Sequence, residues 1–470
     1  MNPSDQFQAI VIGSGQGGNP LCMSLARAGI RTALIERKHV GGTCVNEGCT
    51  PTKTMVASAR VAYLATRGAD YGVHTGDIRI DMERIRKRKR DIVDAFRTRN
   101  EVGMEHTPNL ELIFGEASFA GAKSVLVRLR DGGERVLTAE RIFINAGARP
   151  KVPAIDGLKD VAFLDSTSIM ELGSVPEHLI VLGGGNVGLE FGQMFRRFGS
   201  HVTILQSGGQ LLEGEDADVS GAVAAILKQD GIEVLLNTKA TRVTKESAKI
   251  RVTVSMEMSN ESRDLDGSHL LVATGRTPNT DSLNVSAAGV GIDKRGYIQV
   301  NSKLETNVPG IFALGDIKGG PAFTHISYDD FRILRTNLIE KGSASTDGRM
   351  VPYTLYIDPQ LGRIGLTESE ARAQNKKVRV ARMPMTSVAR ALETDETRGF
   401  MKALVDTQSD RILGFTMFGV MAGEVMATVQ IAMLGGMPYT MLRDAVFTHP
   451  TMLEGLTPLF NGIPPISQPK

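Results

Sequence analysis

Cysteine is scarce in this chain, with three among 470 residues, and tryptophan is absent. So few cysteines exclude the disulfide framework of a small secreted domain and favour a reducing compartment, so we expect a cytoplasmic protein. Long apolar runs are also missing, because none approaches the roughly 18 residues that suggest a membrane span. No signal peptide is evident before the strand-like run QAIVIG, and we expect no membrane partner.

The chain likewise lacks an excess of charge. Its 54 Lys and Arg residues nearly balance 52 Asp and Glu residues, and the net charge of +2 argues against a nucleic-acid partner. A length of 470 residues predicts several domains. One basic run, RIRKRKR at 84–90, is flanked by acidic and apolar residues, which predicts the solvated face of a helix.

The first forty residues have the pattern of a strand, a glycine loop, a helix and a second strand. The glycines fit G-x-G-x-x-G as Gly13, Gly15 and Gly18, and Glu36 ends the second strand 18 residues after the last of them. Such glycines let the backbone approach a pyrophosphate, the helix N-terminus faces its charge, and the acid binds a ribose hydroxyl. This segment therefore predicts a dinucleotide site.

The same unit recurs about 170 residues later, with Gly183, Gly185 and Gly188 in the loop. An internal repeat of this kind implies a second dinucleotide site. Gln206 stands where an acid would end the second strand, and no arginine stands beside it. Because glutamine can bond a ribose hydroxyl without repelling a 2′-phosphate, NADH and NADPH both remain open.

Three further apolar strands end in turns where the chain could close over a nucleotide. The first turn contains Ala146 and Gly147, the second contains Gly275, and the third is Gly315-Asp316. A carboxylate at Asp316 could hold a sugar or ribityl hydroxyl, although Gly-Asp is common in ordinary turns. From about residue 349 the chain changes to β-rich hairpins and a methionine-rich helical region, which predicts a separate α+β domain.

Two of the three cysteines, Cys44 and Cys49, stand five residues apart in GGTCVNEGCTPTK, 41–53. Structural zinc needs four ligands and the chain has no second cysteine pair, so we expect no metal site. A structural disulfide over so short a loop would stabilise the fold only modestly. On a regular helix this spacing separates the Cα atoms by roughly 8 to 9 Å, so the turn must be distorted to close the bond.

A distorted disulfide beside two nucleotide loops favours redox exchange over a structural role. In that interpretation one nucleotide is a flavin, the other is a nicotinamide that brings hydride, and the thiols reduce something outside. Cys22 lies in an apolar helical stretch, and we expect it to be inert core.

The segment GGTCVNEGCTPTK resembles the redox-active helix of the class I pyridine nucleotide–disulfide oxidoreductases, which include dihydrolipoyl dehydrogenase, glutathione reductase and mercuric reductase. The resemblance covers essentially the whole chain, because both glycine loops, A-T-G, Gly-Asp and H-P-T-x-x-E follow in order. It implies an α/β fold with two Rossmann-like domains, for FAD and NAD(P), and a C-terminal α+β dimerisation domain. The implied segments are 1–150 and 277–348 for FAD, 151–276 for NAD(P), and 349–470 for dimerisation.

The resemblance also implies roles for individual residues. Cys49 would lie against the flavin as the charge-transfer thiolate, Cys44 would meet the substrate, and the Lys53–Glu190 ion pair would tune the flavin. Asn186 replaces the tyrosine that often gates the nicotinamide pocket. The expected FAD set is Gly13, Gly15, Gly18, Glu36, Gly42, Thr43, Lys53, Ala146, Gly147, Gly315 and Asp316. The expected NAD(P) set is Gly183, Gly185, Gly188, Glu190, Gln206 and Gly275.

His449 and Glu454 match the C-terminal motif of that family. Thiols that react as thiolates need a nearby group to take up and return their protons, and histidine titrates in a suitable range. The Glu454 carboxylate, five residues after His449, could orient the imidazole. In the family this pair comes from the neighbouring subunit, which implies a homodimer with shared active sites.

The oxidant is less well determined by the sequence. The C-terminal tail has no cysteine pair to hand Hg²⁺ inward, which disfavours the ordinary mercuric reductase mechanism. Residues 319–338 and 345–368 resemble a mercuric-reductase-like bacterial branch that includes the reactive-chlorine-resistance flavoproteins, which reduce hypothiocyanous acid. A small oxidant of that type is the leading hypothesis. Dihydrolipoyl dehydrogenase activity, weak metal-ion reduction and a non-enzymatic, flavin-bound redox sensor are the alternatives.

Overall fold

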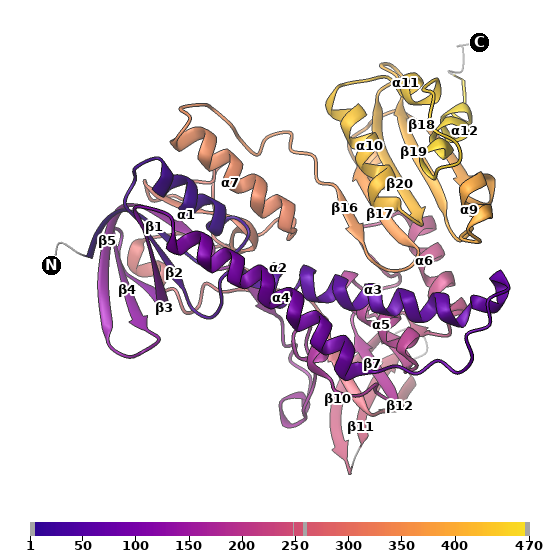
Figure 1. Cartoon of the computed structure of the whole chain (residues 1–470), viewed down its shortest axis with the longest axis horizontal. Helices are drawn as coiled ribbons and strands as arrows, with labels where there is room; N and C mark the ends of the chain where they lie inside the picture. Colours follow the sequence, from indigo (N-terminus) through magenta and orange to yellow (C-terminus); the bar gives the residue numbers. More distant parts are fainter. Residues whose placement is uncertain (1–4, 248, 257–260, 466–470) are drawn as a thin grey trace.

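In the described part of the chain the three largest sheets are a mainly parallel one of six strands, a parallel one of four strands and a five-stranded antiparallel one (Figure 1). The computed structural model describes residues 5–247, 249–256 and 261–465. In Figure 1 the first sheet lies near the N-terminus, the second lies below, and the antiparallel sheet lies near the C-terminus. The α/β fold class and the C-terminal α+β region expected from the sequence are therefore confirmed.

The first sheet has six strands, and its central strands run parallel. They are β1 (Gln6–Ile12), β2 (Thr32–Glu36), β3 (Leu110–Gly121), β4 (Ser124–Leu129), β5 (Glu134–Ile144) and β15 (Ile311–Ala313). Strand β4 is antiparallel to both β3 and β5. Residues 9–12 of β1 are buried, as the continuous apolar run of a parallel strand covered on both faces requires.

Helices α1 (Gly18–Arg27) and α7 (Thr324–Leu338) pack together beside this sheet (Figure 1). Leu21 and Leu25 of α1 form one core with Phe331 and Leu334 of α7. Cys22 lies in the same core and is fully buried, as the sequence predicted. Burial raises the pKa of its thiol to about 12, so this cysteine stays protonated and inert.

The second sheet is wholly parallel, and an antiparallel sheet packs near it. The parallel strands are β13 (His269–Val272), β7 (His178–Leu182), β8 (His201–Leu205) and β9 (Glu233–Leu235). Their helices are α5 (Asn186–Phe198) and α6 (Ala217–Gln229). The antiparallel strands are β10 (Thr238–Glu246), β11 (Lys249–Met256) and β12 (Glu261–Gly267). A short pair, β6 (Ala148–Pro150) and β14 (Arg276–Pro278), forms where the chain passes between the two parallel sheets.

The C-terminal sheet is antiparallel, in the order β16, β17, β20, β19 and β18. These strands are Tyr353–Leu355, Gln360–Gly365, Ile412–Gly419, Phe400–Asp406 and Val378–Pro384. The surrounding helices are α8 (Glu368–Ala373), α9 (Ala389–Glu393), α10 (Ala422–Leu434), α11 (Tyr439–Arg443) and α12 (Leu456–Asn461).

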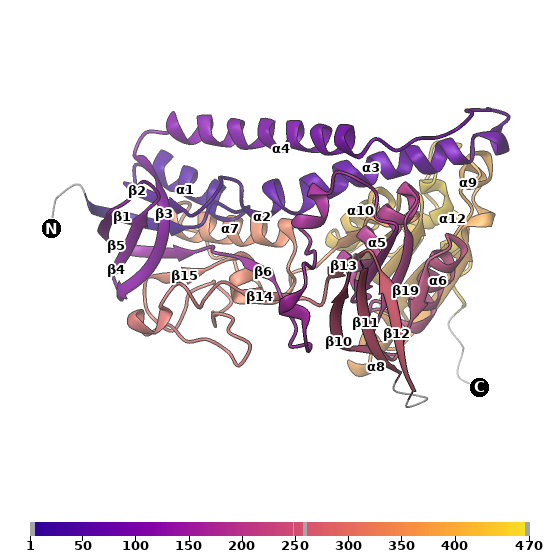
Figure 2. The same cartoon turned by 90° about the horizontal axis from the view of Figure 1, so that it is seen from below.

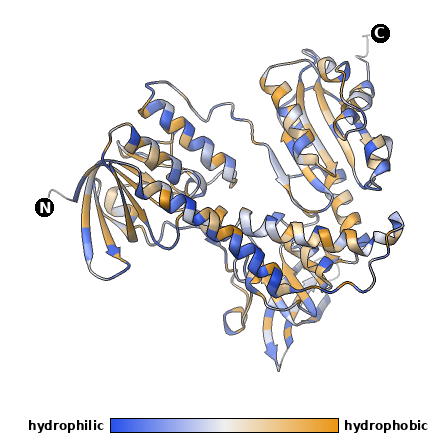
Figure 3. Cartoon of the chain, viewed as in Figure 1, coloured by the Kyte–Doolittle hydropathy of each residue, from blue (hydrophilic) through white to orange (hydrophobic). Residues whose placement is uncertain are grey.

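Two long helices, α3 (Cys49–Thr66) and α4 (Met82–Glu105), run side by side across the molecule (Figure 2). The basic run lies in the hydrophilic first half of α4 (Figure 3). Arg84, Lys87 and Arg90 are exposed, but Lys89 is buried and pairs with Glu171. The prediction of a solvated face is thus wrong at Lys89, because that side chain turns inward to a carboxylate on another segment. Among the described helices, none is both long and apolar enough to cross a membrane.

Candidate active site

The cysteine segment is held against the first glycine loop by contact between two glycines. A Cβ atom on Gly42 would lie 2.6 Å from the Cα atom of Gly15, so neither backbone could approach the other if residue 42 carried a side chain. Helix α2 (Gly42–Asn46) begins at this contact. The Asn46 side chain donates hydrogen bonds to the carbonyl oxygens of Val40 and Gly42, which closes the short helix.

Between the two cysteines the helix is broken, as their spacing predicted. Helix α2 ends at Asn46 and α3 begins at Cys49. A Cβ atom on Gly48 would lie 2.8 Å from the Thr43 carbonyl oxygen, so the turn requires glycine. The break frees the two sulfur atoms from the separation that a continuous helix would impose.

Both thiols are free, and they differ strongly in acidity. A hydrogen bond from Cys44 lowers the pKa of the Cys49 thiol to about 6, and the Thr324 hydroxyl and the Lys53 ammonium act in the same direction against burial. The Thr324 oxygen lies 3.1 Å from the Cys49 sulfur. The same hydrogen bond and burial raise the pKa of the Cys44 thiol. The arrangement places a thiolate on Cys49 and a thiol on Cys44.

The Lys53–Glu190 pair is present, with 2.7 Å between the Lys53 Nζ and Glu190 Oε2 atoms. Lys53 comes from α3 and Glu190 from α5, so the pair joins the cysteine helix to the second glycine loop region. The Glu190 side chain is only 8% exposed, and its second oxygen accepts a hydrogen bond from the Tyr356 backbone N–H at 2.9 Å. The Lys53 ammonium lies 5.0 Å from the centre of the Tyr356 ring.

The first glycine loop is fastened by Asn145, which our sequence analysis did not single out. Its side-chain oxygen accepts a hydrogen bond from the Gly18 N–H at 2.9 Å, and its amide donates to the Leu314 carbonyl at 2.9 Å. Glu36 ends β2 as expected, and its Oε2 atom accepts hydrogen bonds from the Ser14 N–H and hydroxyl at 3.0 and 2.6 Å. The loop and the acid therefore form one connected unit.

A cavity of about 700 Å³ runs from this unit to both cysteines. The expected site residues on its wall are Gly13, Gly15, Glu36, Gly42, Thr43, Cys44, Cys49, Lys53, Ala146, Gly147, Asn186, Glu190 and Asp316. Burial raises the pKa of the Asp316 carboxyl, and Arg276, 3.9 Å away, opposes that shift. A cavity that joins a dinucleotide loop to a thiol pair has the shape needed to bring a cofactor to those thiols.

Other expected residues lie away from this cavity wall. Gly18 starts α1 behind the loop, and the Gly315 N–H donates to the buried Asp330 carboxylate at 2.8 Å. The second-loop residues Gly183, Gly185, Gly188, Gln206 and Gly275 belong to the β7–β8–β13 sheet region, where Gln206 accepts a hydrogen bond from the Gly184 N–H at 2.8 Å.

His449 and Glu454 lie beside each other, but within a single chain they lie outside the cavity that contains the two cysteines. The His449 Nδ1 atom lies 3.0 Å from the Glu454 Oε2 atom, and the histidine side chain is 71% exposed. Neither residue is among the described residues that line the cavity. Thr324, in contrast, reaches the Cys49 sulfur from α7. The sequence analysis did not single out this residue, although it lies in the segment 319–338 that resembles the mercuric-reductase-like branch.

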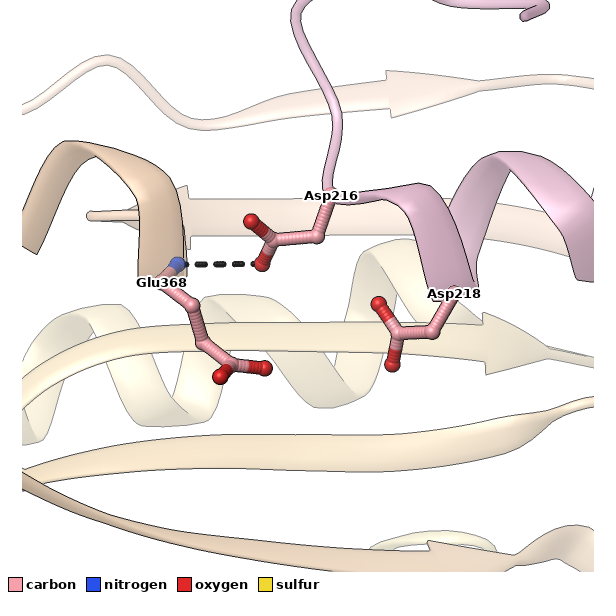
Figure 4. A group of neighbouring side chains, drawn as sticks. All are labelled: Asp216, Asp218 and Glu368. Carbon is pink, nitrogen blue, oxygen red and sulfur yellow. Dashed lines mark hydrogen bonds between the residues drawn. The ribbon is translucent and has the colours of Figure 1, made fainter. Parts of the chain in front are cut away.

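Three carboxylates, those of Asp216, Asp218 and Glu368, gather elsewhere (Figure 4). The ammonium of Lys402, only 1% exposed, lies 2.8, 2.8 and 3.1 Å from their oxygens. The Asp216 carboxylate also accepts a hydrogen bond from the Glu368 N–H at 3.0 Å (Figure 4). A lysine therefore supplies the positive charge at the point where a metal ion would bind.

Comparison with known proteins gives consistent results. The sequence profile of the pyridine nucleotide-disulphide oxidoreductases matches residues 7–330, and the profile of their dimerisation domain matches residues 351–459. The probable pyridine nucleotide-disulfide oxidoreductase RclA of Escherichia coli is 39% identical over 97% of this chain and 99% of its own length. A mercuric reductase of Acidithiobacillus ferrooxidans is 35% identical over 97% of this chain and 82% of its own. The solved structure of the HOCl-induced flavoprotein disulfide reductase RclA from E. coli superposes with a TM-score of 0.88, at 38% identity over 97% and 99% of the two chains.

Proposed function

The chain belongs to the pyridine nucleotide-disulphide oxidoreductase family, and on that premise we propose that it reduces a small thiol-reactive oxidant through a Cys44–Cys49 disulfide. The protein is an NAD(P)H-dependent flavoprotein disulfide reductase. Membership of the family implies FAD and NAD(P)H as its cofactors, and the dimerisation domain supports a homodimer. The oxidant that we propose is of the hypothiocyanous acid type.

The observation that carries this proposal is the single cavity shared by the first glycine loop and the two thiols. FAD, when bound, supplies the transfer of an electron pair from NAD(P)H to a disulfide. We assign its binding to the loop from Gly13 to Gly18, with Glu36 on the ribose and Asp316 on the ribityl chain. The close approach of Gly15 and Gly42 fits this role, since it leaves bare backbone beside the cavity.

The chemistry that the residues themselves perform follows from the two thiol acidities. Cys44 retains its proton, so it needs a base before it can attack. We assign that role to His449, oriented by Glu454 and supplied by the partner subunit. The Cys44 sulfur attacks the sulfur of hypothiocyanous acid, the oxygen leaves with a proton as water, and a sulfenyl thiocyanate forms on Cys44.

The second step uses the thiolate on Cys49. It attacks the Cys44 sulfur, thiocyanate leaves, and the disulfide closes. In total, one thiol, one thiolate and one hypothiocyanous acid give one disulfide, one thiocyanate and one water. Two electrons pass from the thiols to the oxidant, and NAD(P)H restores them. Because the attacked atom is small and reacts directly, this chemistry needs no specialised substrate pocket.

An oxidant panel tests the proposal. Purified enzyme is assayed with hypothiocyanous acid, lipoamide, oxidised glutathione and Hg²⁺, each with NADH and with NADPH. We expect sustained turnover with hypothiocyanous acid and a loss of at least about a hundredfold in Cys44→Ser. The matched control is Cys22→Ala, which removes the buried cysteine outside the site. Preference for another acceptor contradicts the proposed oxidant, and a single turnover followed by silence indicates a redox sensor.

A further inference from the structure

A carboxylate that the sequence pattern did not reveal lies close to the second glycine loop. Gln206 directly follows β8, at the position where an acid would be expected, and Glu213 follows seven residues later. The Gln206 side chain is buried, and its amide is held at both ends. Its oxygen accepts a hydrogen bond from the Gly184 N–H at 2.8 Å, and its nitrogen donates to the Glu213 Oε1 atom at 2.8 Å.

The loop between Gln206 and Glu213 is anchored rather than loose. Leu211 is fully buried and Leu212 is 7% exposed, although both belong to a connecting segment. The Leu212 N–H donates to the Gly184 carbonyl at 3.1 Å, which folds the loop back over the glycine turn. Leu212 adopts a φ of +49°, an uncommon conformation for a branched side chain, so the packing of the two leucines must maintain it.

This folding brings the Glu213 carboxylate down onto the backbone after β8. A Cβ atom on Gly208 would lie 2.4 Å from the Glu213 Oε1 atom, so residue 208 must be glycine for the carboxylate to take this position. In the part of the chain that the structure describes, no lysine or arginine forms an ion pair with Glu213. The negative charge therefore remains uncompensated beside Gln206.

We propose that Glu213, positioned by Gln206, makes the nicotinamide site selective for NADH over NADPH. This inference rests on the proposed function, because it assumes that the second loop binds the nicotinamide coenzyme. In dinucleotide folds an acid at the end of this strand accepts hydrogen bonds from the adenosine ribose, whereas a positive residue accommodates a 2′-phosphate. Here the loop restores the acid that β8 lacks, and a 2′-phosphate dianion would meet it at close range.

Ligand binding tests the proposal independently of turnover. The FAD-loaded protein is titrated calorimetrically at low salt with 5′-AMP and with adenosine 2′,5′-bisphosphate (2′,5′-ADP), which differ only in the 2′-phosphate. We expect 2′,5′-ADP to bind at least about tenfold more weakly to the wild type. Glu213→Gln keeps a side chain that can bond Gln206 and should narrow the difference, and Glu213→Arg should reverse the order. The ratio of kcat/KM for NADH and NADPH should change in the same direction.

The matched control is Glu177→Gln, which removes one exposed negative charge just before the amino end of β7, at the opposite edge of the same sheet. It should leave the affinity ratio unchanged. Equal binding of both ligands by the wild type, or equal ratios in Glu213→Gln and Glu177→Gln, overturns the selectivity while leaving the proposed function intact. If neither ligand binds, the nicotinamide site itself is misassigned, and the proposed function fails with the inference.

Discussion

The Cys44 and Cys49 thiols differ in acidity, although both belong to the same short segment. The hydrogen bond from Cys44 is the largest influence on Cys49, and it holds the pKa of that thiol at about 6. Thr324 and Lys53 add to this effect from α7 and α3, while burial opposes it. Near neutral pH the reduced pair therefore carries one negative charge, located on Cys49.

We expect the reactivity of Cys49 toward iodoacetamide, in the reduced protein, to rise with pH through a midpoint of about 6. Because the pKa is lowered, the reactive thiolate is present above this midpoint and is lost as the pH falls below it. Mass spectrometric fragmentation of the peptide that contains both cysteines distinguishes modification of Cys49 from that of Cys44.

Two variants separate the causes of the shift. Cys44→Ala removes the largest influence and should raise the midpoint the most, whereas Thr324→Val removes only the hydroxyl and should raise it less. A wild-type midpoint near the ordinary cysteine value of about 8.5 would contradict the assignment of the thiolate.

At the scale of elements, the junction between α2 and α3 decides where the two sulfur atoms lie. The α2 helix is only five residues long, and it ends because Gly48 brings the chain within contact of the Thr43 carbonyl. A continuous helix from Gly42 onward would separate the cysteines by more than disulfide geometry allows. The proposed disulfide therefore requires this break, and the stability of the break can be tested separately from the chemistry of the thiols.

Gly48→Ala should destabilise the protein by about 1–3 kcal/mol, because the added methyl group overlaps a backbone oxygen that cannot easily move. Gly221→Ala in α6 is the matched control, since nothing lies within 4 Å of the added Cβ atom. That change should stabilise the helix by about 0.5–1 kcal/mol. Urea unfolding of the reduced proteins measures both. Equal stability of the two variants would show that the junction tolerates a side chain.

At the scale of the whole molecule, a buried lysine joins the second parallel sheet region to the C-terminal sheet. Lys402 lies on β19, Asp216 and Asp218 lie at the start of α6, and Glu368 begins α8. Burial alone would lower the pKa of Lys402, but hydrogen bonds to the three carboxylates raise it. The cluster therefore keeps its full charge and ties the two regions together.

Lys402→Met should cost about 3 kcal/mol of unfolding free energy, because it leaves the buried Asp216 carboxylate unpaired, whereas Asp218 and Glu368 are partly exposed to solvent. Lys87→Met, which breaks an exposed pair with Asp91, is the control and should cost less than about 1 kcal/mol. Urea unfolding at pH 7 and at pH 5 measures both variants. In the wild type the pKa of Asp216 is lowered from its usual value of about 4, so its stabilising contribution is still present at pH 5 and is lost only at lower pH. Protonation should instead relieve the repulsion in Lys402→Met, so the difference narrows at pH 5.

The C-terminal region has an exposed apolar surface that is suited to contact with a second copy of the chain. Apolar side chains stand exposed on the C-terminal region, with Ile431 64%, Leu434 61% and Met441 57% exposed, as expected of a surface that a second copy covers. His449 lies outside the cavity of its own chain, so we expect each cavity to receive this residue from the partner.

Mixed dimers test that sharing. Cys44→Ser and His449→Ala homodimers should each lose activity with the oxidant. Random reassociation of the two variants should restore about a quarter of the wild-type activity, because half of the dimers then contain one intact site. Enzyme assay before and after mixing measures the recovery, and sedimentation confirms that the dimers exchanged. Exchange without recovery would contradict the shared site, and full activity of the His449→Ala homodimer would place His449 outside catalysis.

The sequence by itself determined the features whose physical requirements are local. A phosphate loop needs glycines at fixed spacing between a strand and a helix, so the units at Gly13–Gly18 and Gly183–Gly188 could be recognised in a single window. The need for a break between Cys44 and Cys49 followed from helix dimensions alone. The order of the remaining motifs supported the resemblance to the family, and that resemblance predicted the fold class. The structure and the family profiles confirm the fold class.

The tertiary structure decided which distant groups meet, because packing of sheets and helices brings them together without any local pattern. Thr324 contacts the Cys49 sulfur although the two residues are 275 positions apart in the sequence. Lys89 points inward from α4 and pairs with Glu171. Even Glu213, seven residues from Gln206, takes its place only because Leu211 and Leu212 fold the loop back onto Gly184. Charge and hydrogen bonding at the sites therefore depend on long-range contacts, whereas the identity of the sites depends on short-range spacing.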